Sequence, residues 1–192
     1  KVMNLVFATH NLNKFKEVQL LLPKHVELVS LSDINCHEDI PETAETIEEN
    51  AILKAEYVKT HYGYDCFVDD TGLEVKALNG APGVYSARYA GETKSAQDNL
   101  QKLLQEMKGV EDRAARFKTA IALTLEGRQN MFLGICEGII TQSPRGEKGF
   151  GYDPIFQPNG FTETFAEMSL TQKGEIGHRG KAMRKLIEYL SL

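Results

Sequence analysis

Strand-like and helix-like apolar spacing alternate along the first part of this 192-residue chain. Residues 2–8 are apolar and rich in branched side chains, as in a buried strand, and apolar residues at 12–22 then recur at helical spacing. Residues 26–31 predict a second strand, and Thr46 with Glu49 predicts the capped start of a second helix. This alternation favours an α/β fold over all-α and all-β folds.

The rest of the chain adds a long hairpin to this pattern. We expect two short strands on either side of the turn-like residues 69–72, and a last helix that begins near Lys181. Alternating residues from 117 to 125 predict a long strand, which a turn at 127–130 joins to a partner strand at 131–141. The whole order predicts an α/β protein with a mixed β-sheet flanked by helices.

Composition argues against several classes of protein. The chain carries 22 Lys and Arg against 27 Asp and Glu, a formal charge of −5, whereas broad nucleic-acid binding needs a basic face. Its three cysteines are far apart and form no C-x-x-C pair, which favours reduced thiols. No stretch approaches the ~18 apolar residues of a membrane span, and the first residues lack a signal-peptide pattern. We expect a cytoplasmic protein without a membrane partner, with residues 1–192 forming one domain.

Two acidic clusters are candidates for chemistry. Asp69 and Asp70 follow an apolar segment directly, and adjacent carboxylates repel each other unless a positive group shares their space. Neighbouring side chains of an extended chain point to opposite faces, so we expect one to face the site and the other to support the loop. A second cluster lies between Glu42 and Glu49. Each has an ordinary alternative, a turn for the first and a solvated helix start for the second.

The polar loop Thr9–Lys14 connects a predicted strand to a predicted helix. Free amide hydrogens at a helix N-terminus bind anions, and Lys14 adds a positive charge. The glycines and the G-K-[ST] ending of a Walker loop are absent. The loop therefore predicts a phosphate site of another kind, although Thr and Asn are also ordinary helix caps.

A second loop, Gly146–Asp153, places three glycines around Phe150 and Tyr152. Glycines let the backbone approach a flat ligand while an aromatic ring stacks on it. The alternative is an irregular loop whose aromatic rings fill the core. Lys173 and the basic run 178–181 add positive charge near the last helix. Cations at a helix start oppose the helix dipole, so this arrangement needs a reason; the alternative is a first turn with exposed basic residues.

These features together are more specific than each one alone. Two acidic clusters, a phosphate-binding loop, a stacking loop and dispersed cations suit a nucleoside triphosphate bound with magnesium. Mg²⁺ takes few carboxylates and completes its coordination shell with water and phosphate oxygens.

Six motifs, in order along the chain, add a family resemblance. They are Thr9-x-Asn11-x-x-Lys14, Glu42-Thr43 with Glu49-Asn50-Ala51-x-x-Lys54-Ala55, Asp69-Asp70-Thr71-Gly72-Leu73, Pro82-Gly83-Val84-Tyr85-Ser86-Ala87-Arg88, Gly149-Phe150-Gly151-Tyr152-Asp153-Pro154, and Lys173 with His178-Arg179-Gly180. Along essentially its whole length, the sequence resembles the inosine triphosphate pyrophosphatase family, in particular the bacterial dITP/XTP pyrophosphatases.

The resemblance implies hydrolysis of the non-standard purine triphosphates ITP, dITP and XTP to a monophosphate and pyrophosphate, with Mg²⁺ as cofactor. It also implies a homodimer and an elongated mixed sheet with the site in a central cleft. Asp70 becomes the catalytic acid–base and a metal ligand, Glu42 becomes the second metal carboxylate, and Lys54 and Asp69 become helpers. The implied substrate contacts are Thr9, His10, Asn11, Leu12, Asn13, Lys14, Thr71, Phe150, Gly151, Tyr152, Asp153, Lys173, His178 and Arg179.

The residues implied by the resemblance offer a physical reason for preferring ITP and XTP to ATP. Hypoxanthine and xanthine carry an oxygen at position 6, whereas adenine carries an amino donor. Arg179, with His178, can donate to that oxygen but cannot accept from an amine, and an unpaired buried donor is strongly penalised.

Three positions depart from the residues usual in that family. His10 replaces a small residue and either donates to substrate or only packs. Ala44 replaces a Gly, which puts the local backbone and the exact metal carboxylate in question, whereas Thr71 replaces a Ser and keeps the hydroxyl.

Two other functions stay open, a hydrolase of modified pyrimidine triphosphates and a non-enzymatic nucleotide-binding module. Magnesium-dependent turnover of a panel of triphosphates separates them.

Overall fold

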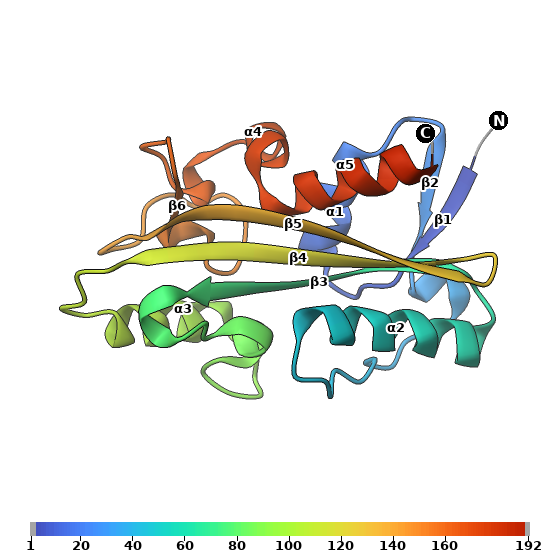
Figure 1. Ribbon diagram of the computed structural model, residues 1–192, viewed down its shortest axis with the longest axis horizontal. Helices are drawn as coiled ribbons and strands as arrows, with labels where there is room; N and C mark the ends of the chain where they lie inside the picture. The colour runs from blue at the N-terminus through green and yellow to red at the C-terminus, as the bar shows by residue number, and fades with distance from the viewer. Residues whose placement is uncertain (1–2, 191–192) are drawn as a thin grey trace. The chain divides into compact units, whose positions relative to one another are not determined.

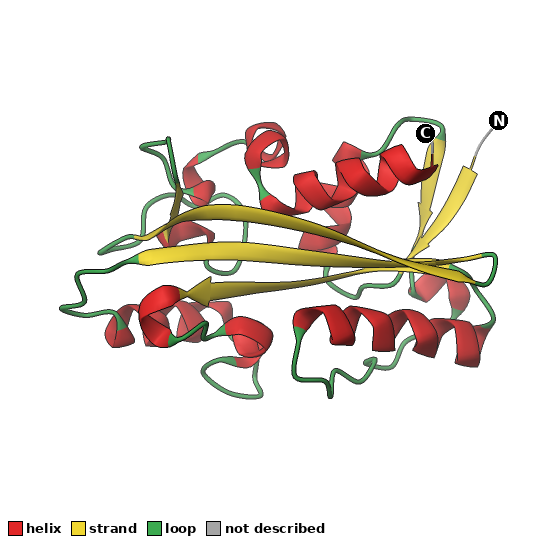
Figure 2. Cartoon of the chain, viewed as in Figure 1, coloured by secondary structure: helices red, strands yellow, loops and turns green. Residues whose placement is uncertain are grey.

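The computed structural model describes residues 3–190, which form a mixed α/β structure (Figures 1 and 2). Val2, expected in the first strand, lies outside these residues. The strands are β1 (Met3–Phe7), β2 (Val26–Val29), β3 (Cys66–Val75), β4 (Ala114–Leu125), β5 (Arg128–Ile140) and β6 (Phe156–Pro158). The helices are α1 (Leu12–Leu21), α2 (Ile47–Tyr62), α3 (Ala96–Glu106), α4 (Leu170–Ile176) and α5 (His178–Leu190). None of the described helices combines the length and the apolar character that a membrane crossing requires.

Within residues 3–190, six strands form one sheet in the order β2-β1-β3-β4-β5-β6. β1 pairs in parallel with β2 and with β3, whereas β5 and β6 are antiparallel. Glu126 and Gly127 join β4 to β5 and both have positive φ, at 51° and 76°, as a type I′ hairpin turn requires. The predicted mixed sheet flanked by helices is confirmed, but the hairpin turn is shorter and earlier than the expected residues 127–130.

The expected turn at residues 69–72 is wrong. β3 runs without interruption from Cys66 to Val75, so Asp69 and Asp70 lie inside a strand. Asp and Gly favour turns locally, but each of the two carboxylates finds a cation in the folded chain, and the extended backbone is retained. After Val75 a short 3-10 helix, Lys76–Leu78, replaces the second half of the strand expected at residues 73–78.

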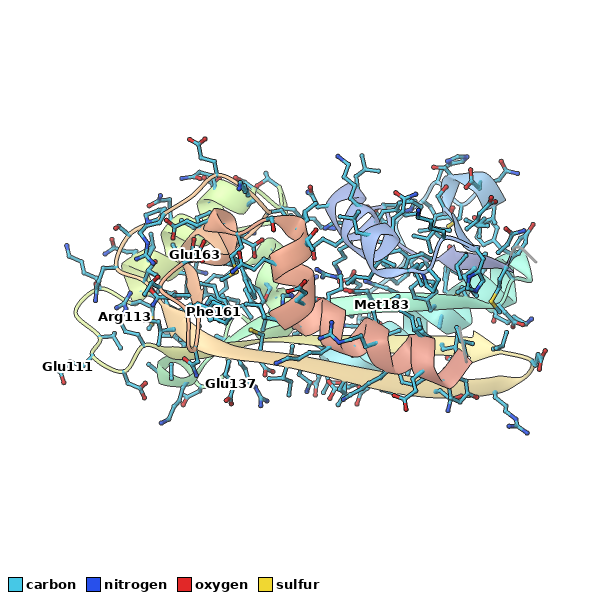
Figure 3. The ribbon with its side chains drawn as sticks, turned by 90° about the horizontal axis from the view of Figure 1, so that it is seen from above. Glu111, Arg113, Glu137, Phe161, Glu163 and Met183 are labelled. Atoms are coloured by element: carbon cyan, nitrogen blue, oxygen red, sulfur yellow. The ribbon has the colours of Figure 1, made fainter. Side chains whose placement is uncertain are left out.

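The chain forms two compact units, the first of which comprises Lys1–Asp70, Thr119–Gly134 and Arg179–Leu192. In this unit α1, α5 and the strands share a core whose buried residues include Phe7, Val18, Phe67, Ile121 and Met183. Met183, on α5, is labelled in Figure 3. Helix α2 covers the strand face opposite to α5 (Figure 1). The loop that follows β1 and the part of β3 up to Asp70 belong to this unit, whereas Thr71 begins the second.

The second unit comprises Thr71–Lys118 and Ile135–His178 and has a core of its own. Fully buried aromatic and aliphatic side chains fill it, among them Leu103, Phe156 and Phe165. Arg113, labelled in Figure 3, donates to four backbone carbonyls, those of Met107, Val110, Ile140 and Thr141. These bonds fix the start of β4 to the end of β5 and to the chain that follows α3.

Candidate active site

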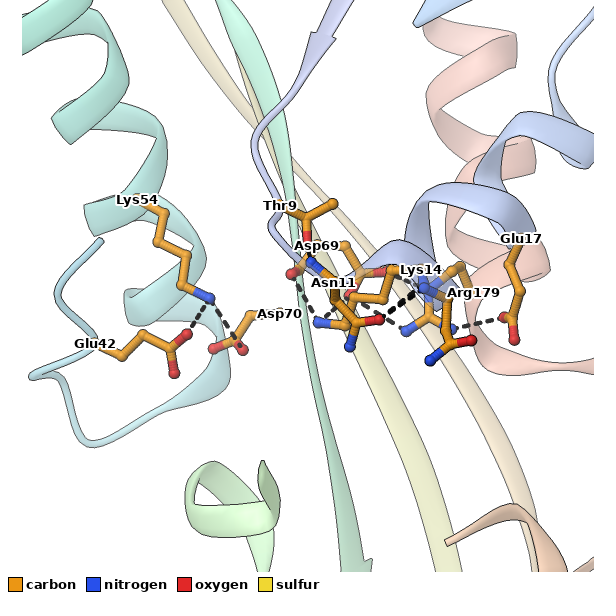
Figure 4. A network of polar contacts seen from close by, with 10 residues as sticks. Thr9, Asn11, Lys14, Glu17, Glu42, Lys54, Asp69, Asp70 and Arg179 are labelled. Carbon is orange, nitrogen blue, oxygen red and sulfur yellow. Dashed lines mark hydrogen bonds and ion pairs between the residues drawn. The ribbon is translucent and has the colours of Figure 1, made fainter. Parts of the chain in front are cut away.

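Strand β3 presents its two adjacent aspartates in opposite directions (Figure 4). Both are buried, with 1% of Asp69 and 8% of Asp70 exposed. Asp69 contacts Lys14 and Arg179, whereas Asp70 contacts Lys54. The expectation that strand geometry separates the two carboxylates is confirmed.

Asp69 lies at the centre of a buried ion-pair network in the first unit. Lys14 Nζ lies 3.0 Å from Asp69 Oδ1 and donates to the Asp69 carbonyl at 3.2 Å. Arg179 Nε donates to Asp69 Oδ2 at 2.6 Å, and its Nη1 donates to Glu17 Oε1 at 2.7 Å. Burial opposes the charge of Arg179, but the two carboxylates outweigh it and raise the pKa of the guanidinium. The network joins α1, β3 and α5.

Two basic residues at the start of the last helix are not exposed. α5 begins at His178, three positions before the expected Lys181, and both His178 and Arg179 are buried. The ring of His178 stacks on that of Phe117 in the second unit, with centroids 4.6 Å apart. The carboxylates of Asp69 and Glu17, which pair with Arg179, supply the reason for a buried cation at this helix start.

The Thr9–Lys14 loop is held by its own side chains. Thr9 Oγ1 accepts a bond from the Asn11 amide at 3.0 Å. Asn11 is the N-cap of α1, and its Oδ1 accepts from the amides of Asn13 and Lys14 at 3.0 and 3.1 Å. The capping interpretation is therefore confirmed, and the ammonium of Lys14 is the positive group that this loop offers. Leu12 is 74% exposed, so its side chain makes little contribution to packing.

Asp70 lies in a different electrostatic environment from Asp69. The ammonium of Lys54, on α2, contacts Glu42 and lies 3.8 Å from Asp70 Oδ1 (Figure 4). Burial raises the pKa of Asp70 from its ordinary 3.8 to about 6, opposed by the charges of Lys54 and Lys14 and assisted by Glu42 and Asp69. A carboxyl group with a pKa near neutrality can both take up and release a proton at physiological pH.

The buried side chain of Asn50 fixes the local backbone at Ala44. The Ala44 amide donates to Asn50 Oδ1 at 2.9 Å, and Asn50 Nδ2 donates back to the Ala44 carbonyl at 3.5 Å. Both backbone groups of Ala44 are thus bound by one buried side chain of α2. The segment that carries Glu42 is held against the helix without a glycine. Glu45 and Glu49 are exposed, as expected of a solvated helix start.

The first unit offers two carboxylates, those of Glu42 and Asp70, that could hold a divalent metal ion. Glu42 and Asp70 contact the same ammonium group, so the position already accommodates positive charge. Among the described residues, no cluster of three or more His, Cys, Asp or Glu side chains could hold a metal ion by itself. Two carboxylates are what Mg²⁺ commonly takes from a protein when phosphate and water oxygens supply the remaining ligands.

In the second unit, Asp153 organises the glycine-rich loop. It pairs with Lys173 at 2.7 Å, both side chains being buried, and its Oδ2 accepts from the Phe150 amide at 3.0 Å. A side chain at Gly149 would place its Cβ 2.1 Å from the same oxygen, so only glycine fits there. Lys173 Nζ lies 4.8 Å from the centre of the Phe150 ring. These contacts account for the loop without a ligand.

The two aromatic residues of this loop have different surroundings. Tyr152 is buried, and its hydroxyl donates to the Ser86 carbonyl at 2.6 Å. Burial raises the pKa of Tyr152. The core-filling alternative thus describes Tyr152, whereas Phe150 is only half-buried. Thr71, also half-buried, follows Asp70 in β3.

Sequence reasoning missed the roles of Glu17 and Ser86. Glu17 lies three positions after Lys14, on the same side of α1, and this spacing was a usable signal. Ser86 lies within a motif that we quoted without a role. Its Oγ accepts from the Leu73 amide at 3.0 Å and donates to the Gly83 carbonyl at 2.6 Å. No local pattern could have shown this pairing.

The fold and these residues together match one protein family. The model of the Ham1 family matches residues 5–189, and the chain belongs to this family. The chain is 66% identical over 98% of its length to the dITP/XTP pyrophosphatase of Christiangramia forsetii, all of which is covered. The Ham1 protein of Coxiella burnetii has a TM-score of 0.90 at 37% identity, covering 99% of both chains. The Staphylococcus aureus Ham1 protein has a TM-score of 0.88 at 40% identity, covering 98% of both. The expected resemblance is confirmed.

Proposed function

We propose that this chain hydrolyses non-standard purine nucleoside triphosphates, namely ITP, dITP and XTP, to the monophosphate and pyrophosphate. The observation that carries the proposal is the buried Asp70, whose pKa near 6 reflects burial and the charges of Lys54, Lys14, Glu42 and Asp69. The relatives named dITP/XTP pyrophosphatase, which match nearly all of this chain, support the substrate class.

Asp70 is the proposed general base of the reaction. Its carboxylate accepts a proton from the water that attacks the α-phosphorus, and a pKa near the working pH suits this transfer. The new bond joins the water oxygen to the α-phosphorus, and the bond to the bridging oxygen of the β-phosphate breaks. The proton taken up is released to solvent, and pyrophosphate leaves. Lys14 and Lys54, whose charges act on Asp70, are the proposed stabilisers of the negative charge that develops on the departing pyrophosphate.

Magnesium is the proposed cofactor, held by Glu42 and Asp70. When bound, it neutralises phosphate charge. Lys54 keeps the two carboxylates together, because its ammonium contacts both. Asp69 acts indirectly, by fixing Lys14 and Arg179.

The remaining candidate residues are proposed substrate contacts. Phe150 is the proposed stacking surface for the base because its ring is half-buried and Tyr152 is taken up by the core. Arg179 and His178 are the proposed donors to the oxygen at position 6. The others, each assigned by the family resemblance, are Thr9, Asn11, Leu12, Asn13, Lys14, Thr71, Gly151, Asp153 and Lys173. For His10, the contact of its Nε2 with the Glu38 carbonyl favours the alternative that this side chain packs against the protein.

Three further proposals concern the whole chain. We propose that residues 1–192 act as a single catalytic domain, which one family model matching residues 5–189 supports. We also propose a homodimer, as the family resemblance implies, and a cytoplasmic location. The net charge of −5 supports the absence of nucleic-acid partners.

The test is a turnover panel of ITP, XTP, GTP and ATP with detection of pyrophosphate, with and without magnesium. We expect magnesium-dependent release from ITP and XTP, and little from ATP. Asp70→Asn should lower turnover by roughly 10²–10⁴-fold, whereas Asp39→Asn, which changes an exposed carboxylate, should not. Near-normal turnover by Asp70→Asn would refute the assigned base. Arg179→Ala should narrow the preference for ITP over ATP.

A further inference from the structure

A carboxylate on the surface of the first unit is fixed by two phenols. Tyr57 Oη donates to Glu38 Oε2 at 2.7 Å. Tyr62 Oη contacts both oxygens of the same carboxylate, at 2.7 and 2.6 Å. Both tyrosines belong to α2. The hydroxyl bonds lower the pKa of Glu38 to about 2, so the acceptor stays ionised at any pH at which an enzyme of this kind works.

The backbone of Glu38 makes a second connection. His10 Nε2 lies 2.9 Å from the Glu38 carbonyl. A carbonyl oxygen can only accept, so Nε2 carries the hydrogen in this contact. His10 lies in the Thr9–Lys14 loop, between Thr9 and the N-cap residue Asn11. Glu38 therefore joins α2 to the loop, through its side chain on one side and its carbonyl on the other.

Helix α2 also binds the chain that follows Glu38. Lys54 contacts Glu42, and Asn50 binds both backbone groups of Ala44. Glu38, Glu42 and Ala44 are thus three attachment points of one segment on a single helix. Of these three, Glu38 is the point at which the loop carrying Lys14 is tied to the segment carrying the proposed metal carboxylate.

We propose that Glu38, clamped by Tyr57 and Tyr62, is a positioning residue that sets the Thr9–Lys14 loop relative to the Glu42 segment through His10. We call these four residues the Glu38 clamp. The inference rests on the proposed function, because Lys14 and Glu42 gain their importance from the phosphates and the metal. It also gives a role to His10, which replaces the small residue usual at this position. None of the four touches Asp70 in the described contacts, so the clamp acts on binding and not on the proton transfer.

The kinetic test removes the phenol hydroxyls and keeps the rings. Tyr57→Phe combined with Tyr62→Phe should raise KM for the magnesium complex of ITP roughly 3- to 10-fold, the effect of about one lost hydrogen bond, with kcat changed less than about 2-fold. Tyr64→Phe, which alters an exposed tyrosine beside α2, is the matched control. His10→Ala should raise KM similarly, and His10→Gln should restore part of the loss because its amide can donate to the carbonyl.

A double-mutant cycle decides whether these residues form one device. Because His10 acts through Glu38, adding His10→Ala to the Phe pair should raise KM little further. The proposal would be overturned by an unchanged KM in the Phe pair. It would also be overturned if the fold-increase in KM of the combined variant equalled the product of the increases in the Phe pair and in His10→Ala. His37→Ala, at an exposed position next to Glu38, controls for loss of an imidazole.

Hydrogen exchange tests the clamp without any substrate. In the Phe pair, amide exchange of residues 9–14 should be roughly 3- to 10-fold faster, whereas the Tyr64→Phe control should match the wild type. Unchanged exchange contradicts the clamp, even in an active enzyme. Conversely, a wild type that releases no pyrophosphate from any triphosphate refutes the proposed function, while faster exchange in the Phe pair still upholds the connection from Glu38 to the loop.

Discussion

Replacing Asp70 by Asn should stabilise the metal-free protein while it abolishes most of the turnover. Burial raises the pKa of Asp70 from 3.8 to about 6. The folded state therefore keeps a proton that the unfolded chain has lost, and stability falls as the pH rises from about 4 to about 6. The difference between these pKa values corresponds to about 3 kcal/mol, because one pH unit is worth about 1.4 kcal/mol.

Asn removes this penalty because it is neutral at every pH. At pH 8 we expect Asp70→Asn to raise the free energy of unfolding by up to about 3 kcal/mol, which is roughly 6–12 °C in Tm for a chain of this size. At pH 4 the gain should vanish, since wild-type Asp70 is then protonated in the folded state. The assay is thermal and urea unfolding in the presence of a chelator, at both pH values.

Two comparisons make this result specific. Asp39→Asn changes an exposed carboxylate and should shift stability by less than about 0.5 kcal/mol. Excess magnesium should narrow the gap between wild type and Asp70→Asn at pH 8, because a bound cation offsets the buried charge. A lower Tm of Asp70→Asn at pH 8, or an equal gain at pH 4 and pH 8, would refute the electrostatic reasoning.

Two further outcomes follow from buried groups. Arg179→Met should lower the free energy of unfolding in urea by about 3–5 kcal/mol, as expected when one partner of a buried ion pair is removed. The lower end of this range is expected because Lys14 still contacts Asp69. A loss under about 1 kcal/mol, no more than that of a surface substitution such as Lys16→Met, would contradict this prediction. Burial raises the pKa of Cys66 to about 12, and all three cysteines are buried. An aromatic disulfide reagent at pH 8 should therefore label none of them in the folded protein and all three in denaturant. Rapid labelling of Cys66 in the folded protein would be inconsistent with its burial.

Much of the architecture could be predicted from local sequence. The apolar spacing at residues 12–22 predicted α1, and the Thr46 cap of α2 is present, with its Oγ1 accepting from the Glu49 amide at 3.1 Å. The long hairpin of β4 and β5 was also expected. These features depend on side-chain periodicity and on capping groups a few residues apart, which the sequence displays directly.

The errors arose where distant partners overrode local preference. Asp69-Asp70-Thr71-Gly72 has the composition of a turn but forms the middle of β3. The last helix was expected near Lys181 but begins at His178, where His178 and Arg179 are buried. In each case a long-range partner compensates for what the local sequence disfavours.

By itself the sequence determined the family, the mixed α/β fold, and the residue types available to bind a magnesium nucleotide, because these depend on periodicity and on ordered motifs. Only the tertiary structure decided which charges meet. Arg179 reaches Asp69 across 110 positions and Glu17 across 162. Pairings of this kind depend on how strands and helices pack, since the desolvation of a buried charge must be compensated by whichever opposite charge the fold brings within reach.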